Sequence, residues 1–140
     1  MSRFPSSSHT WNEFLLDTSS FLWFVYDDTR LSDVGKGLIS NPVTTKYLSL
    51  ASIWELAIKA NLGRGLILHE PFPKFIDGQL STNRFQILRI TISHLKRVHA
   101  LPLHHRDPFD RLLIAQSQVE NIPVITSDAA FDSYEIQRVW

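Results

Sequence analysis

Short apolar runs alternate with helical patterns along most of the chain, and this alternation constrains the fold more than any other feature. The runs expected to form strands cover residues 13–17, 46–50, 85–90 and 123–126, with a last short strand at Val139 and Trp140. Between them, apolar residues recur at helical spacing. Such alternation is typical of a parallel sheet covered by helices on both faces. We therefore expect an α/β fold of three layers, α/β/α, with a mainly parallel central sheet of about five strands.

Capping signals place the helices between these strands. The clearest helix follows Asp107, which suits an N-cap, and Pro108, which suits the first helical position, and its apolar spacing continues to Asn121. Gly63 suits the C-cap of an earlier helix. The hydroxyls of residues 18–20 offer an N-cap for a helix that starts right after them. The other expected helices cover residues 21–26, 32–39, 73–80 and 93–100.

Length and composition bound the domain organisation. With 140 residues, 44% of them hydrophobic, the chain has enough apolar side chains for one independently folding domain. We assign this domain to residues 13–140 and expect residues 1–12 to form a flexible arm. No apolar run reaches the roughly 20 residues of a membrane helix, so no membrane contact is expected. The absence of cysteine excludes disulfides, thiolate metal sites and a cysteine nucleophile, and it fits a cytoplasmic protein.

Charge by itself does not attract a polyanion to this chain. Fourteen acidic residues balance fourteen lysine and arginine residues, so any basic surface must be local. Basic residues gather in two short stretches beside acidic residues: Lys59, Arg64, His104, His105, Arg106 and Arg111. Of these we take four as candidate phosphate contacts: Arg64, His105, Arg106 and Arg111. An ordinary solvated surface charge explains each of them equally well.

Four acidic residues occupy related positions in the expected fold. Asp17 and Asp128 stand at the ends of two apolar strands, and Glu55 and Asp110 stand in the first turns of helices. Parallel strands bring such ends to one edge of the sheet, where open α/β sheets bind their ligands. Carboxylates packed together repel one another and are stable mainly with a divalent cation between them. We expect magnesium or manganese, because these hard ions take oxygen ligands and activate water for phosphodiester cleavage.

Each of these acids also has a purely structural interpretation. Ser52 and Glu55 have the spacing of a capping box, and Asp110 stands at the third position of its helix. Asp17 and Asp128 suit helix N-termini or Asx turns. The residues alone leave both interpretations open, although their joint placement speaks for a shared metal site.

Four stretches of the sequence resemble the PIN domain family, and the resemblance extends from Phe14 to Trp140. The stretches are LLDT at 15–18, SIWELAIK at 52–59, LPLHHRDPFDR at 101–111 and VITSD at 124–128. Their combination is specific. In length, in the order of its acids and in the ending Asp128-x-x-Phe131, the chain is most similar to VapC-type toxins of prokaryotic toxin–antitoxin pairs, which are small ribonucleases.

The resemblance implies a parallel-sheet α/β fold, a Mg²⁺ or Mn²⁺ cofactor and endonucleolytic cleavage of RNA by a toxin whose site an antitoxin blocks. It carries the catalytic and metal-ligand roles onto the acids that match the family in order: Asp17, Glu55, Asp110 and Asp128. Asp107 matches a further acid of the subgroup with the HHRDPFDR signature, and Thr18 and Ser127 neighbour expected ligands. Helix capping explains these three additional candidates as well.

The aromatic segment at residues 21–26 predicts an interface. One face of a sheet cannot cover so many apolar side chains, so Trp23, Phe24 or Tyr26 is expected to face a second subunit or an antitoxin helix. We therefore predict a homodimer and a peptide-like partner.

Two other functions stay open. The first is a PIN-like module that binds RNA or protein without cutting, but its expected mark is a missing acid and all four acids are present. The second is a phosphatase whose first strand ends in Asp-x-Asp, and Asp17-Thr18-Ser19 lacks the second aspartate.

Overall fold

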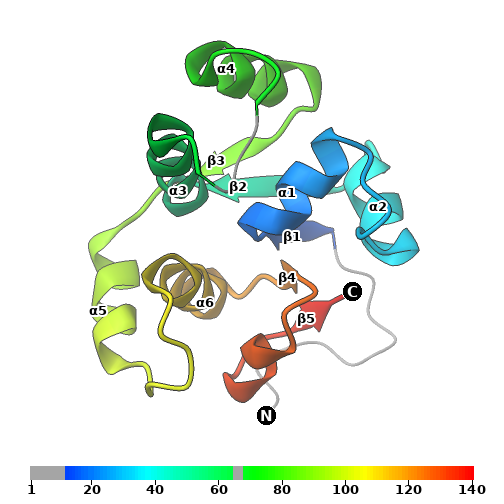
Figure 1. Ribbon diagram of the computed structural model, residues 1–140. Coiled ribbons are helices and arrows are strands. Elements are labelled where there is room, and N and C mark those ends of the chain that lie inside the picture. Colours follow the sequence, from blue (N-terminus) through cyan, green and yellow to red (C-terminus); the bar gives the residue numbers. More distant parts are fainter. Residues whose placement is uncertain (1–11, 65–67) are drawn as a thin grey trace.

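Five parallel strands form the centre of the computed structural model, which describes residues 12–64 and 68–140 (Figure 1). The strands are β1 (Glu13–Leu16), β2 (Thr45–Ser49), β3 (Gln86–Leu88), β4 (Val124–Ile125) and β5 (Arg138–Val139). Their order across the sheet is β3-β2-β1-β4-β5, and each of the four described pairings is parallel. The predicted parallel sheet of about five strands is confirmed.

β1 occupies the centre of the sheet, and the chain builds outward from it in both directions. β2 and β3 lie on one side of it, and β4 and β5 lie on the other (Figure 1). Leu15 of β1 pairs with Tyr47 of β2 and with Val124 of β4. Such a change of direction opens a crevice at the carboxyl ends of the central strands. Asp17 and Asp128 follow β1 and β4 at this edge.

The alternation of side chains along β1 divides the core into two parts. Phe14 and Leu16 belong to one buried cluster and Leu15 to the other. The first cluster is covered by α1 (Thr18–Val25), α2 (Asp33–Ser40), α3 (Leu50–Leu62) and α4 (Phe72–Thr82). The second is covered by α5 (Ile92–Ala100), α6 (Pro108–Glu120) and the short 3-10 helix η1 (Ala129–Ser133). The three-layer arrangement is therefore also as predicted.

Helix α1 begins three residues earlier than the sequence predicts. Its N-cap is Asp17, whose Oδ1 accepts the backbone N–H of Ser20 at 2.9 Å. The helix can therefore start at Thr18, and the prediction that a hydroxyl of residues 18–20 caps it is wrong. The aspartate that ends β1 is also the residue that starts α1.

Helix α3 also begins early, and this changes the interpretation of Glu55. Its N-cap is Ser49, whose hydroxyl accepts the Ala51 N–H at 3.0 Å. Glu55 therefore lies in the second turn, and the predicted capping box with Ser52 is wrong. The Ser52 hydroxyl is buried inside the helix and has no hydrogen-bond partner among the described residues.

The remaining caps agree with the sequence. Asp107 is the N-cap of α6, where its Oδ1 accepts the N–H groups of Phe109 and Asp110 at 2.8 and 3.0 Å. Gly63 ends α3 with a φ of 63°, a left-handed conformation that glycine adopts without a Cβ clash. The elements between residues 72 and 100 agree with the prediction to within about two residues at each end, consistent with normal fraying.

The predicted arm at residues 1–12 falls outside the described part of the chain apart from Asn12, whose carbonyl oxygen accepts the Thr45 N–H at 2.8 Å. The boundaries of the arm and of the domain remain predictions. Within residues 12–64 and 68–140, no helix combines the length and the apolar character that crossing a membrane requires.

Candidate metal centre

The four acids selected from the sequence line one cleft of about 500 Å³, at the edge of the sheet where β1, β2 and β4 end. Asp17 and Asp128 follow strands, Glu55 comes from α3, and Asp110 comes from the first turn of α6. The three additional candidates line the same cleft: Thr18, Asp107 and Ser127. The fold therefore brings these seven residues together from four separate segments of the chain.

Asp17 is the most deeply buried of the four acids. Its Oδ1 accepts the Ser20 N–H, and its Oδ2 accepts the hydroxyl of Thr126 at 2.7 Å. Burial raises the pKa of Asp17 above its usual value, and these hydrogen bonds oppose that rise. The same Thr126 hydroxyl accepts the Asp128 N–H at 3.0 Å, so one buried threonine joins the two aspartates that follow β1 and β4.

Glu55 is held by one residue from each of two helices. The hydroxyl of Thr18 in α1 donates to Glu55 Oε1 at 2.6 Å. Lys59, one turn further along α3, places its Nζ 3.0 Å from Glu55 Oε2. The Glu55 side chain is only 12% exposed, so this ion pair is shielded more than most surface pairs.

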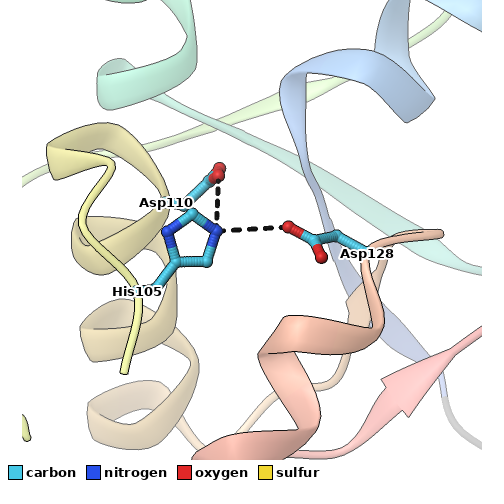
Figure 2. Close-up of side chains that lie close together, drawn as sticks. All are labelled: His105, Asp110 and Asp128. Carbon is cyan, nitrogen blue, oxygen red and sulfur yellow. Dashed lines mark hydrogen bonds and ion pairs between the residues drawn. The ribbon is translucent and has the colours of Figure 1, made fainter. Parts of the chain in front are cut away.

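Asp110 and Asp128 both approach the same ring nitrogen of His105 (Figure 2). The Nε2 of His105 lies 3.2 Å from Asp110 Oδ2 and 3.2 Å from Asp128 Oδ2. Its Nδ1 accepts the Asp107 N–H at 3.2 Å, which places the proton of a neutral ring on Nε2. The ligand atoms of the three side chains lie within 4.8 Å of one another, as around a metal ion. Because Nε2 carries the proton, the groups here that could hold a metal ion are the two carboxylates, and His105 hydrogen-bonds to one of them, Asp128.

The crowding of acids has a clear electrostatic consequence at Asp110. Burial, followed by the negative charge of Asp107, raises the pKa of Asp110 to about 7. Asp17 and Glu55 add to this rise, and His105 opposes it. The nearby cations do not fully neutralise this group of carboxylates, so a divalent cation would be stabilised among them.

Arg111 is tied to the loop that carries His105. Its Nη1 donates to the carbonyl oxygens of Pro102 and His105, both at 3.1 Å. The Tyr134 hydroxyl holds the same loop, because it accepts the His105 N–H at 2.7 Å and donates to the Pro102 carbonyl oxygen at 2.9 Å. This arrangement gives Arg111 a structural role in the loop, and its expected phosphate contact stays a prediction.

The other candidate phosphate contacts are also not among the residues that line the cleft. Arg64 and Arg106 are exposed, and His105 contacts two carboxylates of the lining, Asp110 and Asp128. Among the described residues that line the cleft, the cationic side chains are Lys59 and Arg30. Sequence reasoning overlooked Arg30, Thr126 and Tyr134. The one local signal was at Thr126, which stands two residues before Asp128 on a buried strand.

The aromatic side chains of α1 find partners within the chain. The ring centroid of Trp23 lies 6.0 Å from that of Trp140, and that of Phe24 lies 6.1 Å from that of Phe85. Tyr26 stacks on Phe75 with a centroid separation of 6.1 Å. These rings remain half-buried or exposed, so the predicted interface stays a prediction.

Comparison with known proteins gives one family and a group of structures with the same fold. The family model described as PIN domain matches residues 14–137. A comparison with curated proteins found no match. Solved structures with significant similarity include VapBC2 from Rickettsia felis bound to a DNA fragment, with 16% identity and a TM-score of 0.68 over 91% of this chain and 98% of the other.

Two further structures extend this comparison. FitAcB from Neisseria gonorrhoeae has 16% identity and a TM-score of 0.65 over 91% of this chain and 96% of the other. A toxin–antitoxin complex from Klebsiella pneumoniae has 19% identity and a TM-score of 0.55 over 81% of this chain and 85% of the other. At these identities the likeness shows a shared fold, and it agrees with the resemblance found in the sequence.

Proposed function

Because the chain belongs to the PIN domain family, we propose that it is a Mg²⁺- or Mn²⁺-dependent endoribonuclease, the toxin of a toxin–antitoxin pair. The observation that carries the proposal is the meeting of Asp17, Glu55, Asp110 and Asp128 in one cleft. We assign the catalytic and metal-ligand roles to these four residues. Asp107, Thr18 and Ser127 are additional candidates, because they line the same cleft.

The donor set of the cleft fits a hard divalent cation. Its candidate ligands are carboxylate and hydroxyl oxygens, and the chain has no cysteine. Burial is the first cause of the raised pKa of Asp110, and the second is the negative charge of Asp107, which a bound cation would offset. A divalent cation bound there supplies polarisation of the phosphate and activation of an attacking water.

The protein's own contribution is to hold the carboxylates before the substrate arrives. Thr126 and the N-terminus of α1 fix Asp17, and Thr18 and Lys59 fix Glu55. His105 Nε2 hydrogen-bonds to Asp128 Oδ2 and lies equally close to Asp110 Oδ2, so it keeps the two carboxylates near each other. Groups held in this way need little rearrangement during the reaction, which is the usual source of electrostatic catalysis.

The direct test is cleavage of labelled single-stranded RNA by the purified protein in magnesium, in manganese and in a chelator. We expect cleavage with either metal and none with the chelator. Asp17→Asn and Asp128→Asn should each reduce the rate at least about 100-fold, because each removes a ligand charge. Asp77→Asn is the matched control, since Asp77 is exposed on α4 away from the cleft. Cleavage in chelator, or full activity of both site variants, would reject the proposal.

The antitoxin and the homodimer are further parts of the proposal. One of the similar structures is described as a toxin–antitoxin complex, which supports an antitoxin partner here. A second copy is supported by the side chains of Trp54, Ile58 and Leu62, which follow one another every four residues along α3 and are 58%, 38% and 61% exposed. Sedimentation velocity tests the dimer. A monomer at all concentrations would count against the dimer, and an unchanged dimer after Ile58→Glu would count against this face of α3 as its interface.

A further inference from the structure

The cleft has a second half that the metal site does not use. Beyond the acids it is lined by Leu22 and Trp23 of α1, by the C-cap Tyr26, and by Asp28 and Arg30 in the loop after α1. Helix α1 connects the two halves, because Asp17 caps its first turn and Tyr26 caps its last. At 1.5 Å per residue its eight residues span about 12 Å, so the aromatic half lies within about one helix length of Asp17.

Arg30 is held in position at this end of the cleft. Its Nε and Nη2 donate to the carboxylate of Asp28, with Nη2 2.7 Å from Oδ2, and its own backbone N–H donates to Oδ1 at 2.9 Å. These bonds lower the pKa of Asp28 to about 2, so the partner stays ionised. The guanidinium carbon lies 5.1 Å from the centre of the Trp23 ring, a cation–π distance. The Arg30 side chain is still 68% exposed.

The Arg30 guanidinium has unused N–H donors on the edge that faces away from Asp28. An arginine has five N–H donors, and within the described residues the hydrogen bonds of this group go to Asp28 alone. Such a fixed, partly used guanidinium suits phosphate oxygens better than a freely moving one, because less side-chain entropy is lost on binding.

The charges of the cleft make Arg30 the natural contact for a phosphate. Six carboxylates line the cleft, against only two cationic side chains in the described part of the chain, Lys59 and Arg30. Both cations are paired, Lys59 with Glu55 and Arg30 with Asp28, but Arg30 is the more exposed of the two, and the edge of its guanidinium away from Asp28 keeps N–H donors. A substrate phosphate next to the scissile one therefore finds its best-placed donors at that edge of Arg30.

We infer that Arg30, which Asp28 and Trp23 hold in position, binds a backbone phosphate of an unpaired RNA strand beside the cleavage site. Trp23 and Tyr26 line the space for the base of that nucleotide. This inference rests on the proposed ribonuclease function. An unpaired strand fits for two reasons. A cleft of about 500 Å³ has the size of a small-molecule site, and aromatic walls suit bases released from a duplex stack.

Fluorescence anisotropy with a labelled single-stranded RNA tests the inference separately from catalysis. Calcium replaces magnesium, because its looser coordination fills an oxygen site while suiting the reaction poorly, and the RNA is checked for integrity after each titration. Arg30→Ala should weaken binding about tenfold and lower the slope of log Kd against log salt by about 0.7, as expected for one lost contact with a single strand. Arg30→Lys keeps the charge and should retain the slope with weaker binding.

Arg89→Ala is the matched control, because Arg89 is exposed and lies apart from the cleft. This variant should leave the Kd for the single strand and the salt slope unchanged. In a separate comparison, a duplex of the same sequence should bind the wild type more weakly than the single strand. Equal binding by Arg30→Ala and the wild type, in a protein that still cleaves RNA, would overturn the inference and leave the proposed function standing. Equal losses in Arg89→Ala and Arg30→Ala would also overturn it. A wild type that neither binds nor cleaves RNA would instead refute the proposed function.

Discussion

Replacing Asp110 with asparagine should stabilise the metal-free protein at alkaline pH. Burial and the charge of Asp107 raise the pKa of Asp110 from 3.8 to about 7, so the folded chain holds its proton more tightly than the unfolded chain does. Stability is therefore lost as the pH rises from 3.8 to about 7. Asparagine has nearly the same shape and cannot ionise, so the variant escapes this loss.

The size of the effect follows from the pKa. When the pH rises from 5 to 8, a carboxyl whose pKa in the folded chain is about 7 lowers the free energy of unfolding by about 3 kcal/mol. The Asp110 side chain is 25% exposed, and the solvent that reaches it reduces this to about 2 kcal/mol. Asparagine also changes the 3.2 Å contact with His105 Nε2, which shifts the stability of the variant at both pH values, so the informative quantity is the change between the two.

Urea unfolding at pH 5 and pH 8 in a chelator measures this change. The free energy of unfolding of Asp110→Asn, relative to the wild type, should rise by about 2 kcal/mol between the two pH values, or by about 7 °C in melting temperature. Asp77→Asn, on an exposed position of α4, should show no such rise. Magnesium added at pH 8 should stabilise the wild type more than Asp110→Asn. A constant difference between wild type and variant across the pH range would refute the reasoning.

Three further substitutions test the support of the site and of the fold. Thr126→Val should lower the free energy of unfolding by about 2 kcal/mol and weaken Mn²⁺ binding measured by calorimetry, because Asp17 loses a buried hydrogen bond, and Thr126→Ser should restore both. Tyr134→Phe should lower the free energy of unfolding by about 1 kcal/mol and speed hydrogen exchange at the His105 amide, because it removes the acceptor of that N–H. Unchanged exchange would contradict the role of Tyr134 in holding the loop. Gly63→Ala should lower the free energy of unfolding by about 1 kcal/mol, and with it the melting temperature, because a φ of 63° is unfavourable for a residue with a Cβ. Gly63→Asn should lower both by less.

The fold could be predicted because its signals are local. The alternation along β1 is visible in Phe14, Leu15 and Leu16, which the structure divides between the two buried clusters. The caps Asp107 and Gly63 are equally local, since each acts on the residues next to it. The start of α3 was missed because two serines, Ser49 and Ser52, compete for the cap, and the structure ends β2 at Ser49.

The partners of the acids could not be predicted, because they are far away in the sequence. Thr126 meets Asp17 only through the pairing of β1 with β4, and Tyr134 meets the His105 loop only after η1 folds back. Arg30 could not be identified for another reason. The residues next to it in the sequence do not distinguish it from other exposed arginines, and only the folded position of α1 places Trp23 beside it. Acids can be found from their positions at strand ends, whereas hydrogen-bond partners depend on tertiary structure.

The structure also removes an apparent choice between capping and catalysis. In Asp17 and Asp128 the two carboxylate oxygens have different tasks: Oδ1 accepts a backbone N–H at a helix start, while Oδ2 faces Thr126 or His105. The cap fixes the side chain, so the second oxygen is already aimed when a ligand arrives. An asparagine keeps the capping oxygen and an alanine loses both. Asp17→Asn should therefore fold about 1 kcal/mol more stably than Asp17→Ala while binding Mn²⁺ equally poorly, and equal stability of the two variants would show that the cap does not matter.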